Sequence, residues 1–211
     1  MTERRHRPNA QARRRSLLLA AVEVAAESGI AGVTHRAVTE RAGVPLATVS
    51  YFFSSIDELA EEALRVFAAE DAQANITVAE GLSAVESTPD EVLSVFSAVA
   101  APRMPETLAL IEAYLHAARN EPFRDAVSGA LSAAREAAAA GLKAAGSPDP
   151  EVGAEAFVAL IQGLSLHEAA VPGSVAPGVA RNALRALFLG YLVDAGQGEQ
   201  ALALVEDSPA E

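Results

Sequence analysis

The sequence lacks cysteine and holds only four histidines in 211 residues. Without cysteine it cannot form a disulfide framework, an Fe–S cluster, a thiolate zinc site or a thiol nucleophile, and this absence is typical of a reducing compartment. Its longest stretch without a charged residue, 42–56, has 15 residues and includes glycine, proline and hydroxyl side chains, whereas a membrane-spanning helix needs about 20 apolar residues. The basic N-terminus has no secretion-signal pattern, so we expect a soluble, cytoplasmic protein.

Alanine, by contrast, is abundant and accounts for 48 residues, about 23% of the chain. It is the residue that costs least in a helix, and runs of β-branched residues, which favour strands, are few. Hydrophobic residues make up 51% of the chain, which is enough to build a core and too much for a disordered protein. The composition therefore predicts an all-α protein with one large or two small domains.

The two parts of the chain carry opposite charge. Residues 1–56 have a net charge of +4 and the remaining 155 residues have a net charge of −16, which together give −12. Six of the eight arginines in the first segment lie between Arg4 and Arg15. A basic segment on an acidic body indicates that this segment binds a polyanion; the alternative is a solvated, disordered tail.

Helix-start and helix-stop residues divide the chain into about nine helices. Gly29 ends the first helix, Thr34 caps the second, and Ser55 with Glu58 forms a capping box that opens the fourth. The nine predicted ranges are 10–27, 35–41, 45–51, 55–80, 89–101, 102–119, 121–146, 150–170 and 177–195. The segment after Gly196 is weak in every secondary-structure signal.

The second and third predicted helices are joined by a turn that contains Gly43, which is a helix-turn-helix pattern. The third helix, from Pro45 to Tyr51, contains no charged residue. Small and hydroxyl side chains on such a helix can enter the major groove of DNA and contact base edges and thymine methyl groups. An ordinary buried helix would also lack charge, but the upstream arginines and Arg36 and Arg41 on the second helix favour DNA binding.

Residues 34–44 (THRAVTERAGV) and 51–59 (YFFSSIDEL) resemble the DNA-binding domain of the tetracycline-repressor (TetR) family. The shared pattern is Thr-x-Arg-x-Val/Ile, then Ala-Gly-Val, an aromatic cluster ending in phenylalanine, and an acidic pair before leucine. The resemblance, which covers about residues 10–60, implies a helix-turn-helix DNA-binding domain with a basic arm (1–56) and a helical ligand-binding and dimerisation domain (57–211). It also implies a ligand-responsive transcriptional repressor that binds a pseudo-palindromic operator as a homodimer.

The resemblance assigns roles to residues of the helix-turn-helix. Thr34 would cap the second helix and contact a phosphate, Arg36 would support either the helix or the backbone contact, and Phe53 would be a core residue. Phe52 stands where the family usually has a phosphate-contacting tyrosine, and Ile56 where a lysine is common. Both departures are expected to weaken affinity for the DNA backbone, and the arginine-rich arm is expected to compensate. The DNA-binding residues implied in this way are Thr34, Arg36, Pro45, Leu46, Ala47, Thr48, Ser50, Tyr51 and Phe52.

The eighth and ninth predicted helices are apolar on nearly all sides. Such a helix must be covered on both sides, and a monomer of this size offers little cover, so a dimer interface is predicted; the alternative is a monomeric core. The resemblance implies the same, a bundle of two helices from each subunit in which Gly163 and Gly190 allow close approach. The predicted interface residues are Leu160, Gly163, Leu164, His167, Ala183, Leu187, Gly190 and Tyr191.

The resemblance also implies a ligand cavity between the fourth and eighth helices. Its candidate lining residues are Phe96, Met104, Leu108, Ile111, Tyr114, Leu115, Phe123, Phe157 and Ile161, most of which are better explained as ordinary core residues. Their lack of charge predicts a largely apolar ligand. Glu112 and His116, two polar residues in the same stretch, are four apart and are expected to pair across one helical turn.

No enzyme motif in the sequence has the residue spacing or the neighbouring secondary structure that its chemistry requires. The histidines lack metal-ligand spacing, and His167 and Glu168 are not followed by the second histidine of a zinc-protease motif. Gly196-Gln197-Gly198 imitates a dinucleotide fingerprint but follows a helix instead of a strand. We therefore predict a non-enzymatic regulator without cofactor or metal, whose partners are double-stranded DNA, a small-molecule effector and a second copy of the chain. The alternative is an all-helical small-molecule-binding protein or enzyme with no DNA-binding role.

Overall fold

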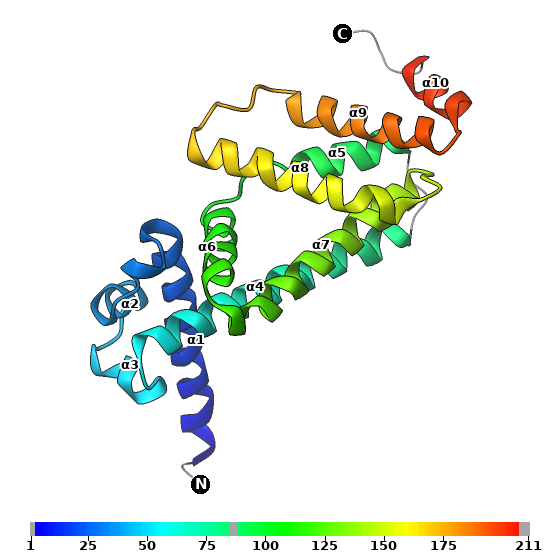
Figure 1. Ribbon diagram of the computed structural model, residues 1–211. Helices are drawn as coiled ribbons and strands as arrows, with labels where there is room; N and C mark the ends of the chain where they lie inside the picture. The colour runs from blue at the N-terminus through cyan, green and yellow to red at the C-terminus, as the bar shows by residue number, and fades with distance from the viewer. Residues whose placement is uncertain (1–2, 85–87, 207–211) are drawn as a thin grey trace. The chain divides into compact units, whose positions relative to one another are not determined.

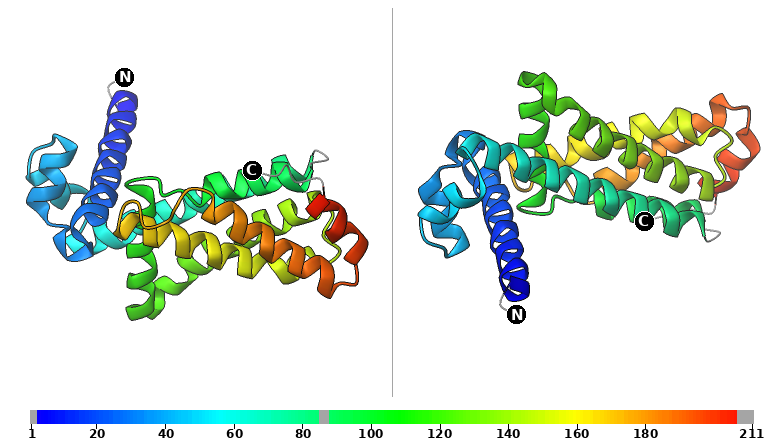
Figure 2. Two further views of the ribbon diagram at one scale, coloured as in Figure 1. Left: turned by 90° about the horizontal axis from the view of Figure 1, so that it is seen from above. Right: turned by 90° about the horizontal axis from the view of Figure 1, so that it is seen from below.

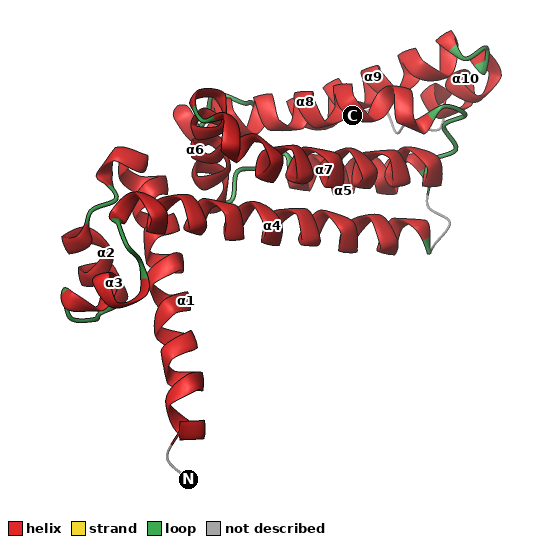
Figure 3. Cartoon of the chain, turned by 60° about the horizontal axis from the view of Figure 1, so that its bottom comes forward, coloured by secondary structure: helices red, strands yellow, loops and turns green. Residues whose placement is uncertain are grey.

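The computed structural model describes residues 3–84 and 88–206, with the side chains of residues 10–84 and 88–205. Within these ranges the chain forms ten α-helices, two short 3₁₀ helices and no strand (Figures 1 and 3), which confirms the predicted all-α fold. No helix in the described ranges has the length and apolar character needed to cross a membrane. The α-helices are α1 (Glu3–Ser28), α2 (His35–Ala42), α3 (Ala47–Phe52), α4 (Ile56–Ser83), α5 (Pro89–Val99), α6 (Glu106–Arg119), α7 (Arg124–Ala144), α8 (Pro150–Ala170), α9 (Val179–Asp194) and α10 (Gly198–Glu206), and the 3₁₀ helices are η1 (Ile30–Gly32) and η2 (Glu121–Phe123).

The helix-turn-helix begins and ends where its capping residues predict. Gly29 follows α1 with a φ of 72°, and Gly43 follows α2 with a φ of 65°. Both values lie in the left-handed region that glycine adopts without steric cost. Between them, Thr34 Oγ1 accepts a hydrogen bond of 3.2 Å from the backbone N–H of Ala37, as an N-cap does. These three residues fix the bounds of α2 and confirm the predicted second helix.

Several predicted bounds are wrong, and one helix was missed. Helix α6 begins at Glu106 and not at residue 102, and α7 begins at Arg124 after the 3₁₀ helix η2 and not at residue 121. Helix α1 begins at Glu3 and not at residue 10, and it runs through Pro8. Pro8 has no backbone N–H to donate to the carbonyl of Arg4, and α1 nevertheless continues through it. A tenth helix, α10, follows Gly196 where no helix was predicted. Ala201 of α10 is buried against the core that α9 helps to build, and this packing supplies the stabilisation that the local sequence does not indicate.

Packing divides the chain into two compact units. The first unit comprises Met1–Asp71 and Arg103–Ala130, and therefore contains α1 to α3, the first part of α4, and α6. The second unit comprises Ala72–Pro102 and Leu131–Glu211, and therefore contains α5, α8, α9 and α10. The chain passes between the units within α4, within α7, and between α5 and α6. This division describes packing, and the functional division at residue 56 remains a prediction.

The core of the first unit fixes the helix-turn-helix to its supporting helices. Helix α1 packs against α2 and α6, and α2 packs against α3. Leu17, Val38, Val49, Leu59 and Phe123 are fully buried there, one from each of α1, α2, α3, α4 and η2. Burying an aliphatic or aromatic side chain of this size contributes roughly 1.5–3 kcal/mol each. The third helix is therefore anchored through Val49, which leaves its other residues free of the core.

The second unit is built around α5, α8 and α9, which lie side by side (Figure 1). The rings of Phe96 and Phe157 meet edge to face with centroids 5.6 Å apart, and Phe188 is buried in the same cluster. Gly141 of α7 is required here, because a Cβ at that position would lie 2.4 Å from Cζ of Phe96. Close contact between α7 and the Phe96 ring therefore depends on a residue without a side chain.

Candidate nucleic-acid interface

A short turn positions α3 after α2. Beyond Gly43, the backbone N–H of Val44 donates to the carbonyl of Thr39 over 3.0 Å, and the N–H of Thr48 donates to the carbonyl of Pro45 over 2.9 Å. Pro45 lies in this turn, and α3 itself begins at Ala47. The predicted third helix is thus present, but it begins two residues later than predicted. The first hydrogen bond ties the turn to the end of α2 and the second ties it to the start of α3, so the turn fixes the orientation of α3 relative to α2.

Helix α3 turns an uncharged face to solvent. Only Val49 of this helix is buried, whereas Leu46 is 60% exposed and Tyr51 is 78% exposed. The other residues predicted to face the groove are also accessible: Pro45, Ala47 and Ser50 are exposed, and Thr48 is half-buried. The alternative interpretation, an ordinary buried helix, is therefore wrong. An exposed surface of small, hydroxyl and aromatic side chains is suited to contact base edges in a major groove.

The connection from α3 to α4 is held by aromatic and polar contacts. Phe53 is buried, as predicted, and the Arg14 guanidinium lies 5.0 Å from its ring centroid. Phe52 is half-buried, with its ring edge-on to Tyr51 at 4.8 Å, and Ile56 is the half-buried first residue of α4. These contacts set the angle between α3 and α4, and they give Phe52 and Ile56 packing roles.

The predicted capping box at the start of α4 forms in a modified way. Ser55 Oγ accepts the backbone N–H of Glu58 over 3.0 Å, but the Glu58 carboxylate accepts the N–H and the hydroxyl of Ser54, at 2.6 and 2.5 Å. These hydrogen bonds lower the pKa of Glu58, with the Ser54 hydroxyl as the largest cause. The carboxylate therefore stays charged at neutral pH. It lies in the first turn of α4, where the helix dipole favours negative charge.

Ion pairs occupy several of the arginines that the sequence offers to DNA. Arg14 pairs with Glu62, and Arg15 pairs with Glu70 at 3.1 Å, so both connect α1 to α4. Arg41 is enclosed between two carboxylates of α1, Glu23 at 3.0 Å and Glu27. The hydrogen bond to Arg41 lowers the pKa of Glu27, and that bond in turn raises the pKa of Arg41. Sequence reasoning counted these three arginines but did not foresee that they are already paired.

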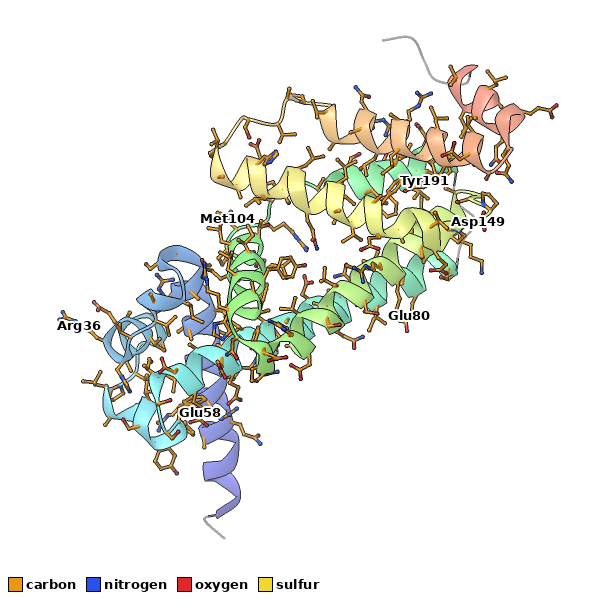
Figure 4. The ribbon with its side chains drawn as sticks, viewed as in Figure 1. Arg36, Glu58, Glu80, Met104, Asp149 and Tyr191 are labelled. Atoms are coloured by element: carbon orange, nitrogen blue, oxygen red, sulfur yellow. The ribbon has the colours of Figure 1, made fainter. Side chains whose placement is uncertain are left out.

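Arg36 is the accessible cation of α2. Its side chain is 90% exposed and is only weakly paired with Glu40, at 3.9 Å one helical turn away. In Figure 4 it points outward from α2. Thr34, the residue predicted to contact a phosphate beside it, is exposed as well. Both residues are therefore accessible at the start of α2.

Helix α6 is hydrogen-bonded to the segment between α1 and α2 and to α4. The Glu112 carboxylate accepts the backbone N–H of Ile30 over 3.2 Å, at the start of η1 between α1 and α2. Near the other end of α6, the Glu61 carboxylate of α4 accepts from Asn120 and lies 3.4 Å from Nε2 of His116. The predicted pairing of Glu112 with His116 is therefore wrong, because each contacts a different element. Both contacts connect α6 to segments that position α3.

The candidate ligand-pocket residues are divided between the two units. Phe96 and Phe157 are buried against each other in the second unit, where Ile161 is half-buried. In the first unit, Phe123 is fully buried between the Arg65 guanidinium and the His116 ring, both 4.9 Å from its centroid. The remaining candidates belong to the first unit: Leu108, Ile111 and Tyr114 are half-buried, and Met104 and Leu115 are exposed.

A groove in the first unit lies elsewhere, between α1 and α4. It encloses about 110 Å³, whereas ligand pockets measure roughly 300–1,000 Å³. None of the nine candidate residues lines it. Its lining residues are Arg15, Leu18, Leu19, Val22, Ala63, Val66, Phe67 and Glu70. The groove is too small for a drug-sized ligand.

The predicted interface residues lie on α8 and α9 of the second unit, which pack against each other. None of them is fully buried in a single subunit. His167 and Gly190 are exposed, and Leu160, Gly163, Leu164, Ala183, Leu187 and Tyr191 are half-buried. A Cβ added at Gly163 or at Gly190 would meet no atom within 4 Å. The two helices therefore present a partly exposed apolar strip, and Gly163 and Gly190 lie within it.

Comparison with known proteins covers both parts of the chain. Residues 17–63 match the family model described as "Bacterial regulatory proteins, tetR family", and residues 83–190 match "Tetracyclin repressor-like, C-terminal domain". No curated protein matches the chain. Among solved structures, a transcriptional regulator from Rhodococcus sp. Rha1 is 25% identical with a TM-score of 0.67, over 86% of this chain and 96% of that one.

Two further structures are of similar closeness. A TetR-family member from Streptomyces coelicolor A3 is 29% identical with a TM-score of 0.62, over 83% of this chain and 97% of that one. The multidrug binding protein EbrR, in complex with imidazole, is 28% identical with a TM-score of 0.59, over 83% of this chain and 94% of that one. EbrR has also been solved in complex with proflavin. The similarity thus extends along nearly the whole length of these proteins.

Proposed function

Given that the chain belongs to the tetracycline-repressor family of DNA-binding transcriptional regulators, we propose that it is a ligand-responsive repressor that binds a pseudo-palindromic operator as a homodimer. Proteins of this family regulate transcription and are not enzymes, which removes the enzymatic alternative. The observation that carries the proposal is the exposed, uncharged face of α3, with Leu46 and Tyr51 largely open to solvent. On a short helix that follows a helix-turn-helix turn, such exposed side chains are available to contact base edges.

The contacts with DNA follow from the accessibility of the helix-turn-helix. Base edges are read from α3 by Pro45, Leu46, Ala47, Thr48, Ser50 and Tyr51. Thr34 and Arg36 contact phosphates from α2, where both are exposed. Phe52 contacts the backbone through its ring alone, since it has no hydroxyl to donate. Because phosphate contacts fix the register and base contacts provide the specificity, α3 determines which sequence is bound.

Selection of bound fragments from random duplex DNA by the purified chain tests this function. We expect an enriched pseudo-palindrome whose two half-sites are one turn of DNA apart, roughly 34–36 Å, because a symmetric dimer places two copies of α3 at that spacing. Specific binding is expected to be at least about 10³-fold tighter than binding to unrelated DNA. Enrichment of a single half-site would contradict the homodimer, and no enrichment would contradict the function itself.

The homodimer is supported by the partly exposed apolar strip of α8 and α9. Leu160, Leu164, Leu187 and Tyr191 are each half-buried in one subunit, and a second copy would remove the rest of their apolar surface from water. Burial of apolar area contributes about 25 cal/mol per Å². The open space at Gly163 and Gly190 allows backbones to approach closely, since glycine has no side chain to hold them apart.

The effector is proposed to be a small, largely apolar organic molecule. The relative EbrR forms complexes with imidazole and with proflavin, two ring-shaped compounds. The residues proposed to contact the effector are Phe96, Met104, Leu108, Ile111, Tyr114, Leu115, Phe123, Phe157 and Ile161. The α6 helix carries four of them and is hydrogen-bonded to the helix-turn-helix through Glu112. A ligand that displaces α6 would therefore change the placement of α3, and α4, which belongs to both units, offers a second route.

Reciprocal binding measurements test this regulation, with proflavin as the probe. Linkage requires that proflavin lower operator affinity by the same factor by which operator lowers proflavin affinity. We expect a factor of about 5 to 150, the usual range of allosteric coupling. Calorimetric titrations of proflavin into the free protein, into the operator complex and into the operator duplex alone measure it; the titration into duplex alone is subtracted because proflavin, a planar cation, also intercalates into DNA. Equal proflavin affinity in the two titrations would contradict induction by this route, and titration with an unrelated duplex in place of operator is the control.

A further inference from the structure

Arg14 of α1 lies against the segment that joins α3 to α4. Its guanidinium is 5.0 Å from the ring centroid of Phe53, the buried residue that directly follows α3. Its Nη2 donates to both carboxylate oxygens of Glu62, in the second turn of α4. Helix α1 passes beside the beginning of α4 in both views of Figure 2. A single side chain of α1 therefore contacts both the residue that ends α3 and the helix that follows it.

The pair of Arg14 with Glu62 is more shielded from solvent than the neighbouring pair of Arg15 with Glu70. The side chains of the first pair are 38% and 30% exposed, and those of the second are 70% and 50% exposed. An exposed ion pair contributes little because water and salt screen it, whereas a partly buried pair is screened less. Loss of one partner from a shielded pair also leaves the other charge without compensation. The two pairs thus join the same two helices with different energetic weight.

The charge of Arg14 also reaches the first turn of α4. There the Glu58 carboxylate accepts the backbone N–H and the hydroxyl of Ser54, which directly follows Phe53. These hydrogen bonds are the largest cause of the lowered pKa of Glu58, and the charge of Arg14 lowers it further. Arg14 therefore supports two consecutive residues of the connection, Phe53 through its ring and Ser54 through Glu58.

This arrangement adds no net charge to the surface that faces DNA. The positive charge of Arg14 is compensated within the protein by Glu62, so a phosphate would have to compete with a carboxylate that is already hydrogen-bonded. Any contribution of the pair to DNA binding must therefore act through the placement of α3. A recognition element held in its bound orientation loses less freedom on binding, and apparent affinity falls in proportion to the fraction of molecules that hold that orientation.

We propose that Arg14 and Glu62 are positioning residues for operator binding, which hold the connection from α3 to α4 and do not contact DNA themselves. The proposal rests on the proposed function, since it requires that α3 read the operator. It gives an acidic residue a favourable effect on binding to a polyanion. Charge alone predicts the opposite, because removal of a negative charge strengthens the attraction to DNA.

Neutralisation of each partner in the full chain tests the proposal. R14Q and E62Q should each weaken operator binding by about tenfold, the size expected for loss of a partly shielded contact between a cation and a ring. The double variant R14Q/E62Q should lose no more than either single variant, because both substitutions remove the same interaction. Glutamine has nearly the shape of glutamate, so E62Q changes the charge and keeps the packing of α4.

The matched control is E70Q. It also removes an α4 carboxylate that pairs with an arginine of α1, but this pair is the exposed one. Glu70 lies eight residues beyond Glu62, about two turns farther along α4. E70Q should therefore bind the operator at least as tightly as wild type.

Unrelated DNA and salt dependence separate positioning from other roles. Because base contacts provide the specificity, R14Q and E62Q should bind an unrelated duplex nearly as wild type does, whereas a loss of folded protein would weaken both kinds of binding equally. A direct phosphate contact by Arg14 would make the slope of log K against log salt shallower by about 0.9 in R14Q. Positioning leaves this slope unchanged.

The outcomes that overturn the proposal differ from those that overturn the proposed function. An E62Q protein that binds the operator as tightly as wild type, or more tightly, would overturn the positioning role, and so would a shallower salt slope for R14Q or equal losses on operator and unrelated DNA. In each of these cases wild type and E70Q would still recognise the operator. Failure of wild type to select any operator would instead defeat the proposed function, and the positioning role with it.

Discussion

Leucine in place of Gly190 is expected to convert the proposed homodimer into monomers and to lower operator affinity at least a hundredfold. In a single subunit the substitution is harmless: Gly190 is exposed, its backbone is helical, and a Cβ there meets no atom within 4 Å. Leucine is also the better helix former by roughly 0.5–1 kcal/mol. A monomer should therefore fold at least as well as wild type. In a dimer whose α9 helices approach closely, the same side chain has no space.

The loss of operator affinity follows from the loss of one of two linked half-site contacts. Joining two binding modules raises affinity by about 10²–10⁴ through effective concentration alone. Sedimentation analysis and operator titration of G190L measure the two effects together. G129L is the control, because Gly129 of α7 is also helical and exposed, with no atom within 4 Å of an added Cβ, but lies outside the predicted interface. A G190L protein that remains dimeric would contradict the proposed interface.

Features set by neighbouring residues could be predicted from the sequence. Thr34, Gly29 and Gly43 act on backbone groups within a few positions of themselves, so their effect can be recognised without knowing the fold. The same holds for Thr88, which forms a capping box with Glu91 at the start of α5. Helix order and most boundaries follow from such local hydrogen bonds and from apolar periodicity, which is why the all-α fold was predictable.

Long-range pairings could not be predicted in the same way. Arg14 and Glu62 are 48 positions apart, and Glu112 lies 82 positions from Ile30. Which carboxylate reaches which arginine is determined by how the helices pack, and the sequence gives only the number of charges. For the same reason, the pairing of Glu112 with His116 across one turn was plausible but wrong, since packing brought a backbone N–H and another carboxylate closer.

Packing also explains the helix that was missed. The segment that forms α10 contains glycine at both 196 and 198, and glycine destabilises a helix by about 1 kcal/mol relative to alanine. Local propensity therefore argues against helix there. Packing outweighs this unfavourable local propensity, because Ala201 is buried and Leu204 packs against the core of the second unit. Whether a marginal segment becomes helical depends on such contacts.

Replacing Tyr51 with alanine is expected to weaken operator binding by at least about 30-fold without changing the stability of the protein. Tyr51 is 78% exposed, so its removal should alter the free energy of unfolding by less than about 0.5 kcal/mol. A side chain that contacts a base contributes about 1–3 kcal/mol of discrimination, and the proposed dimer carries two copies, so the loss is at least about 2 kcal/mol. The loss should appear in operator affinity and leave binding to unrelated DNA nearly unchanged.

Two variants separate the possible causes of that loss. Tyr51→Phe keeps the ring and removes the hydroxyl, so near wild-type affinity would assign the contact to the ring, and a loss equal to that of alanine would assign it to the hydroxyl. Leu202→Ala is the matched control, since Leu202 of α10 is 64% exposed but lies far along the chain from α3. If Tyr51→Ala binds the operator as wild type does, α3 does not read base edges through Tyr51. Leu46, the other large apolar residue exposed here, would then carry the recognition or the orientation proposed for α3 would be wrong.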